Sequence, residues 1–181
     1  MGWSLDYVPI REPELLAQFF SAAGKALYLA TAFEAKCRYV LRIAKLAHRY
    51  QETGDASATM ALAEVLKDRM LCATIKELKG FSEIEAADID LLEKAKGARN
   101  YIAHECAGFG PLSGVSAKSI HEQLGRLREQ VVVLAAGDNV VSRWVYEIEE
   151  KEAAPREIQD TYVLRVEEWV FGELLTNRGD R

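Results

Sequence analysis

Three polar side chains near the middle of the chain have the residue types needed for acid–base and phosphate chemistry. Arg99, Asn100 and His104 lie close together within the segment from Leu91 to Cys106. Arginine offers a fixed fork of N–H donors that matches phosphate oxygens, and histidine takes and gives a proton near neutral pH. This pair is the minimum set for cutting RNA without a metal ion: the imidazole removes the 2′-hydroxyl proton, and the cation stabilises the charge that develops on the attacked phosphate.

An amphipathic helix is predicted to carry these residues. Asp88 or Asp90 is expected to cap its start, and Gly108 follows its end. His104 is predicted to leave the core side, because it points about 200° away from the last buried position, and Asn100 lies one turn before it. The predicted buried stripe repeats at steps of three and four residues: Leu91, Ala95, Ala98 and Ile102.

Arg99 and His104 cannot easily act together from one straight helix. They are five residues apart, which is about 140° around the helix axis. A symmetric dimer that packs two such helices face to face would place both residue types around one cleft. Asn100 could then orient His104 or hold the substrate, and Lys96 lies one turn earlier as a candidate substrate contact. Taken singly, His104 also suits an exposed or capping position, and Arg99 a surface ion pair with Glu93 or Glu105.

Composition indicates a soluble globular protein of one domain. Apolar residues make up 49% and charged residues 28% of the 181 residues, and the net charge is −5. A nucleic-acid site would therefore have to be a local basic patch on an acidic protein. The odd number of cysteines, Cys37, Cys72 and Cys106, predicts free thiols in a cytoplasmic protein. Neither a membrane-spanning run nor a signal peptide is recognisable.

Helical periodicity runs through most of the chain. A long helix is predicted from Glu12 to Tyr50, bent or broken at Gly24 and ending near Gly54. A second helix, capped by Asp55 or Ser57, is predicted to run to about Lys79 and to pack antiparallel to the first. Ser116 is expected to cap a further helix over 117–136.

The last part of the chain, from residue 137 onward, combines a predicted helix end, an ambiguous segment and a further predicted helix. Gly137, Asp138 and Asn139 are predicted to end the preceding helix. The segment 140–151 fits a helix, but its β-branched residues would also suit a strand. Pro155 breaks this segment, and a last helix is predicted at 156–175. Its predicted buried residues are Val163, Val166, Trp169, Val170 and Leu174. We therefore predict an all-α antiparallel bundle, with a core at about 12–136 and an extra C-terminal helical segment at 137–181.

A basic ridge accompanies the core stripe of the first helix. Arg38, Arg42, Lys45 and Arg49 recur at steps of four, three and four residues. Such a ridge is ordinarily a solvated face, but it could also follow an RNA backbone through phosphate contacts. The spacing alone leaves both interpretations open.

Other catalytic motifs are absent from the sequence. There is no P-loop, no Gly-rich dinucleotide turn, no Cys-x-x-Cys pair, no His-Glu-x-x-His pair and no nucleophile elbow. His104, Glu105 and Cys106 do not have metal-site spacing, because neighbouring helical residues diverge in direction. We expect neither a metal nor a cofactor.

The segment from Ala98 to His104 resembles the Arg-x4-His signature of the HEPN superfamily, in its Arg-Asn-x-x-x-His form. That superfamily is all-helical, and the predicted helices match its layout over about residues 12–136. The resemblance implies a metal-independent endoribonuclease that acts as a dimer, with Arg99 and His104 as the catalytic pair and Asn100 as their polar helper. Many relatives are toxins of toxin–antitoxin pairs or act in phage defence, which implies RNA as substrate and an antitoxin or partner enzyme.

The resemblance also bears on two other residues. In many such enzymes an acidic residue on an early helix supports the site, and Glu34 is the candidate here, although an ordinary helix ion pair with Arg38 would explain it too. One HEPN toxin subgroup continues the motif as His-x-Tyr, and a partner enzyme modifies that tyrosine. Cys106 stands at this position, so we do not expect silencing through it.

Two other classes of function compete with the nuclease. The chain could be a HEPN-like module without catalysis that binds nucleotides or a protein partner. It could also be an unrelated helical DNA-binding regulator, but the acidic pI and the lack of helix-turn-helix spacing count against this.

Overall fold

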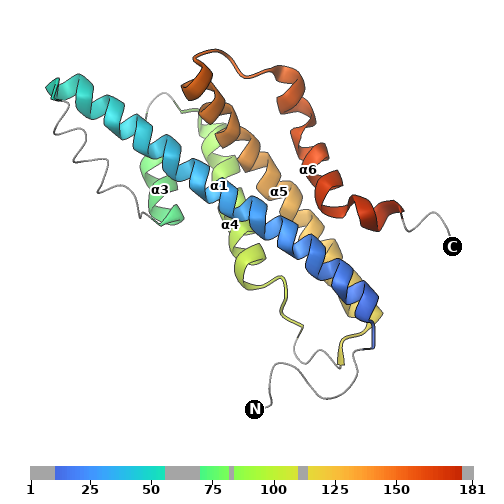
Figure 1. The fold of residues 1–181 in the computed structure, drawn as a ribbon. Coiled ribbons are helices and arrows are strands. Elements are labelled where there is room, and N and C mark those ends of the chain that lie inside the picture. The colour runs from blue at the N-terminus through green and yellow to red at the C-terminus, as the bar shows by residue number, and fades with distance from the viewer. Residues whose placement is uncertain (1–10, 56–69, 82–83, 110–113, 177–181) are drawn as a thin grey trace.

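A computed structural model describes residues 11–55, 70–81, 84–109 and 114–176, without the side chains of 173–176. Every regular element in these ranges is an α-helix, which confirms the predicted all-α bundle. No helix in the described part of the chain has an apolar stretch long enough to cross a lipid bilayer. Within the described ranges there are five helices: α1 (Pro13–Thr53), α3 (Leu71–Leu78), α4 (Ala86–His104), α5 (Ala117–Glu150) and α6 (Arg156–Thr176) (Figure 1).

The first long helix forms as one continuous rod. Pro13 opens α1, where a missing N–H costs nothing, and Gly24 causes no break because its neighbours remain helical. Gly54 ends the helix in the left-handed region, with φ 62°, and its N–H donates to the Tyr50 carbonyl at 2.8 Å. The predicted end was therefore correct. The predicted second helix falls partly on residues 56–69, outside the described residues, and its last turns are α3.

The helix that carries Arg99 and His104 starts earlier than predicted. α4 begins at Ala86 after Glu85, and neither Asp88 nor Asp90 caps it. Asp88 lies in the first turn, is buried, and accepts a hydrogen bond from Arg143 of α5 at 2.5 Å. The prediction was wrong because this carboxylate is used in packing α4 against α5.

The prediction that α5 ends at Gly137, Asp138 and Asn139 was also wrong. Ser116 caps α5 with a reciprocal capping box, as predicted, but the helix then continues to Glu150. Gly137 is needed for close packing, since a Cβ there would lie 2.3 Å from the Cβ of Ala95. Asp138 is fully buried and Asn139 donates to the backbone of α6. These residues are present for tertiary contacts, and the ambiguous segment 140–151 is mostly helix.

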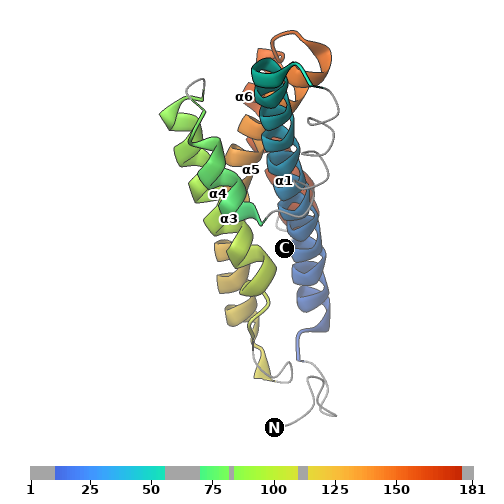
Figure 2. The same ribbon diagram turned by 90° about the vertical axis from the view of Figure 1, so that its left-hand side faces the viewer.

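The helices form a bundle in which α5 packs against α1, α4 and α6. α1 and α4 run in opposite directions, and α3 lies beside α4 (Figure 2). In α6, Val166 and Val170 are buried, but Trp169 is 47% exposed, contrary to the prediction, and its ring meets Tyr28 edge-on. The largest fully buried apolar side chains are Phe19, Phe33, Ile75, Leu78, Leu92, Ile120, Leu127, Leu134, Val131 and Val141.

Candidate functional site

The centre of the candidate site is an ion pair between α1 and α4. A guanidinium N–H of Arg99 donates to Glu34 Oε2 at 2.5 Å, although the two residues are 65 positions apart. The Glu34 side chain is 11% exposed and that of Arg99 is 25% exposed. The pair is therefore largely shielded from water, and it fixes Arg99 against α1.

A second guanidinium shares the same carboxylate. Arg38, one turn after Glu34 on α1, donates to Oε1, while Arg99 donates to Oε2. Burial alone would raise the pKa of Glu34, but the hydrogen bonds and positive charges of Arg38 and Arg99 outweigh it, so the pKa lies below its ordinary value. Glu34 is thus an anion, and two cations around one carboxylate leave a local charge of +1.

Asn100 adjoins this pair, and His104 follows Arg99 by five residues on α4, about 140° around the helix. Both are exposed, and Arg99 donates to Asn100 Oδ1 at 3.2 Å. His104 is the last residue of α4, and no side chain in the described part of the chain pairs with it. Its imidazole is therefore open to a ligand, whereas Arg99 is held from two sides.

We call Glu34, Arg38, Arg99, Asn100 and His104 the seam. The first four are linked by hydrogen bonds at the α1–α4 contact, whereas His104 ends α4 about 140° around the helix from Arg99. On α1, Lys45 reaches Glu77 of α3 and lies two turns after Arg38 on the same face. On α4, Glu93 accepts from Lys79 just beyond α3 at 2.8 Å. Lys96, Asn100 and His104 follow Glu93 at steps of three, four and four residues. α3 therefore covers one end of the seam and leaves the other end open.

The remaining predicted substrate contacts are mostly occupied by carboxylates. Lys96 pairs with Glu93, and on the basic ridge Lys45 pairs with Glu77 and Arg49 with Glu52. Arg42 is half-buried one turn after Arg38. The ridge is therefore in large part a face of ion pairs, and Arg38 is its member that the structure brings to Arg99.

Cys106, which stands where one toxin subgroup has tyrosine, faces the core. Its side chain is buried, its thiol donates to the Ile102 carbonyl at 3.0 Å, and burial raises its pKa. A buried neutral thiol is a poor target for modification. This position therefore plays no part in the exposed surface of the seam.

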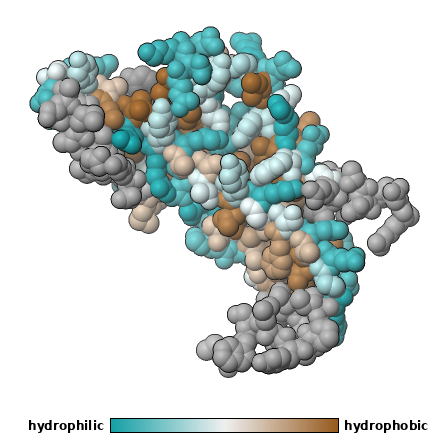
Figure 3. All heavy atoms as spheres, in the orientation of Figure 1, coloured by the Kyte–Doolittle hydropathy of each residue, from teal (hydrophilic) through white to brown (hydrophobic). Residues whose placement is uncertain are grey.

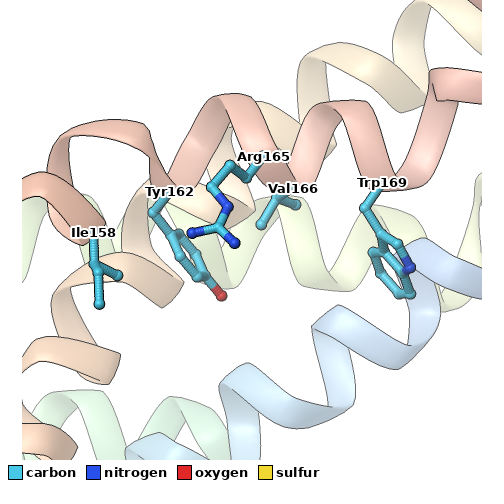
Figure 4. A pocket seen from close by; sticks show the side chains of 5 residues that line it. All are labelled: Ile158, Tyr162, Arg165, Val166 and Trp169. Carbon is cyan, nitrogen blue, oxygen red and sulfur yellow. The ribbon is translucent and has the colours of Figure 1, made fainter.

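A separate hollow of about 350 Å³ lies along α6, and its lining consists of Ile158, Tyr162, Arg165, Val166 and Trp169 (Figure 4). Periodicity could not reveal it, because Trp169 has the spacing of a core residue. The Tyr162 hydroxyl donates to the buried Asp138, so the hollow presents mainly its ring. None of the residues of the seam lines it.

Comparison with known proteins identifies no relative of this chain. No protein-family model, curated protein or solved structure matches the chain. Within the described residues, no group of three or more histidine, cysteine or acidic side chains could hold a metal ion.

Proposed function

We propose that the chain is a metal-independent endoribonuclease of HEPN type, a cytoplasmic toxin-like protein that acts in growth arrest or phage defence. The main support is the Glu34–Arg99 ion pair, which holds an arginine beside the exposed Asn100, on the helix that ends with the exposed His104. A packed helix needs no such grouping to fold. The ion pair links the predicted supporting carboxylate to the predicted phosphate-binding residue.

The residues of the seam have distinct roles in the proposed reaction. Arg99 binds the scissile phosphate and stabilises its extra negative charge, since a fixed guanidinium needs little reorganisation. His104 removes the 2′-hydroxyl proton, and Asn100 holds the substrate beside it. The 2′-oxygen attacks the adjacent phosphorus, the bond from phosphorus to the 5′-oxygen breaks, and the departing 5′-oxygen takes a proton from water. Glu34 keeps Arg99 in place, and Arg38 keeps the local charge positive.

A second copy of the chain completes the proposed site. Arg99 and His104 point about 140° apart on α4, so one copy presents them in different directions. A homodimer through the Arg99–His104 helix would bring the Arg99 of one copy toward the His104 of the other. An antitoxin or partner enzyme would act by covering this surface.

The proposal is tested with purified protein, free of any antitoxin, and varied RNAs in EDTA. We expect cleavage that leaves 2′,3′-cyclic phosphate ends, and its loss in Arg99→Ala and His104→Ala. The matched controls are Arg128→Ala, which removes a surface ion pair with Glu167, and His121→Ala, which removes an exposed histidine on α5. Both controls should cleave like the wild type, and all four variants should keep their helical circular dichroism.

If the RNA stays uncut at high protein concentration, the proposed nuclease activity is contradicted. Cleavage that survives in His104→Ala would contradict the role of this histidine. If the protein leaves RNA intact but still binds nucleotides or a protein partner through the seam, the alternative of a HEPN-like module without catalysis is correct.

A further inference from the structure

Three exposed or half-exposed apolar side chains lie at the open end of the seam. Leu27 is 46% exposed and Phe20 is 43% exposed, both on α1, and Phe109 follows α4. On the face drawn in Figure 3, hydrophobic atoms are exposed where α4 ends beside the first half of α1. We call these three residues the apolar platform. Exposed apolar groups that gather in one place commonly mark a binding surface.

Two contacts fix where the platform lies relative to His104. Arg99 meets Glu34, and the Phe109 ring meets Phe19 edge-on at 4.8 Å between centroids. His104 comes after Arg99 and before Phe109 in the chain. Because α1 and α4 are antiparallel, it lies opposite the part of α1 between Phe19 and Glu34. His104 is about 7.5 Å along α4 from Arg99, and Leu27 is about 10 Å along α1 from Glu34. Leu27 therefore lies at about the level of His104.

The rings of the platform are held in a defined geometry. After α4 the chain turns sharply, with Cys106 N–H donating to Tyr101 and Phe109 N–H donating to Ala107. This turn brings Phe109 back onto α1, where its ring lies 6.5 Å from that of Phe20 at an interplanar angle of 88°. Rings that are fixed before binding lose little conformational freedom when a flat ligand packs on them.

The order of side chains along the seam indicates the ligand. Measured along the bundle axis from α3 outward, the order is Arg38, Arg99, His104 and the platform, that is two cations, a proton-transfer group on another face of α4, and an aromatic surface. Proteins that bind single-stranded nucleic acid combine cations that follow the phosphates with aromatic rings on which bases stack.

We propose that the apolar platform is a base-binding site, which holds an unstacked nucleobase of the RNA strand whose phosphate lies on Arg99. This inference rests on the proposed function and adds that the substrate is single-stranded at this point. The base packs on Phe20 and Phe109, and Leu27 lies between them and the level of Arg99. Phe20 is about 20 Å along α1 from Glu34, so the base belongs to a nucleotide about three positions along the strand from the phosphate on Arg99. Base-paired RNA has its bases stacked inside the duplex and cannot use the platform.

Two uncleavable oligonucleotides test the proposal. One is a short 2′-O-methyl adenylate strand, which lacks the 2′-hydroxyl nucleophile. The other is an abasic 2′-O-methyl strand with the same number of phosphates. Fluorescence anisotropy at fixed salt gives the Kd of each. The wild type should bind the adenylate strand on the order of tenfold more tightly than the abasic strand.

Variants assign this difference to the platform. Phe20→Ala should weaken binding of the adenylate strand to the level of the abasic strand and leave abasic binding unchanged, whereas Arg38→Ala should weaken both strands alike. Tyr28→Ala is the matched control, since Tyr28 is an exposed aromatic residue on α1 that contacts Trp169 instead. Should Phe20→Ala fail to fold, Phe20→Leu keeps an apolar contact with Phe109 but removes the ring.

The outcomes separate the inference from the proposed function. Equal binding of both strands by the wild type would contradict base binding by the platform. It would not contradict the proposed nuclease activity. If Phe20→Ala changes the oligomeric state in analytical ultracentrifugation while base discrimination persists, the platform is a contact with a second copy and the inference is wrong. If the wild type binds neither strand, the proposed function fails, and the platform fails with it.

Discussion

Two polar clusters meet on α1 only two residues apart, and they differ in the burial of their outer residues and in net charge. The seam cluster, on the α4 side, consists of Glu34, Arg38, Arg99 and Asn100. The buried cluster, on the α5 and α6 side, consists of Lys36, Asp138, Ser142 and Tyr162. Residues two apart on a helix point to nearly opposite sides, which separates the two clusters.

The buried cluster is nearly complete in its hydrogen bonding. Asp138 is fully buried and accepts from Lys36 Nζ at 2.8 Å and from the Tyr162 hydroxyl. Lys36 also donates to Ser142 at 2.8 Å. Burial, followed by the charge of Asp138, raises the pKa of Tyr162, which therefore stays a neutral donor. The cluster ties α1, α5 and α6 together, and we expect it to serve the fold.

The seam cluster is open where the buried cluster is closed. Arg38 is 38% exposed, Asn100 is exposed, and the two cations outnumber the one carboxylate. Open donors and an excess of charge contribute little to stability but can bind an anion. The difference suggests that the fold depends on one cluster and the proposed activity on the other.

The largest effect should follow from removing the buried carboxylate. Asp138→Ala leaves the Lys36 ammonium and the Tyr162 hydroxyl without their acceptor, and we expect it to lower the free energy of unfolding by about 3–5 kcal/mol. Urea denaturation measures this. The control is Asp160→Ala, an exposed aspartate on α6, which should change it by less than about 0.5 kcal/mol. A loss below about 1 kcal/mol for Asp138→Ala would remove the contrast between the clusters.

Two glycines of α5 should respond to the same substitution with opposite signs. Gly137→Ala places a Cβ against Ala95 and the Leu91 backbone, and we expect a loss of about 1–3 kcal/mol. Gly125 has no neighbouring atom within 4 Å of an added Cβ, so Gly125→Ala should stabilise the helix by about 0.5–1 kcal/mol. Thermal unfolding of both variants checks the difference. Similar shifts would show that α4 does not approach α5 closely at Gly137.

Glu34→Gln should have a smaller effect on stability, and one that depends on pH. The amide keeps the shape but loses the charge, and we expect a loss of about 1–2 kcal/mol at neutral pH. The pKa of Glu34 is depressed in the folded state, so its contribution is complete above the unfolded-state value of about 4.5 and is lost as the pH falls through the lower folded-state value. Urea titrations of wild type and variant should therefore converge in acid. A difference that grows toward low pH would contradict the ionised Glu34.

Arg38→Ala should have the smallest effect on the fold. Its side chain is more than one-third exposed, so we expect a change of about 0–1 kcal/mol in stability. RNA affinity should fall by about tenfold if Arg38 contributes one phosphate contact. Urea denaturation and RNA binding on the same preparation measure both quantities. A large loss of stability would show that the seam cluster also holds the bundle together.

The sequence by itself determined most of the helical content and which helix carries each candidate residue. Hydrophobic periodicity predicted the long helices, because the 3.6-residue repeat is a local property of the chain. Local signals also predicted the Gly54 end of α1, the Ser116 cap of α5 and the exposed position of His104. Glu34 was a candidate from the resemblance, and both of its predicted partners, Arg38 and the Arg99 site, are in contact with it.

Only the tertiary structure decided what depends on distant residues. Gly137, Asp138 and Asn139 have the composition of a helix end, but contacts with α1, α4 and α6 keep α5 helical through them. Asp88 is of a residue type that often caps the start of a helix, but its carboxylate binds Arg143 instead. Trp169 has the spacing of a core residue, yet no element covers it fully. Local spacing determines which residues share a helix face, and the packing of whole helices determines what that face meets.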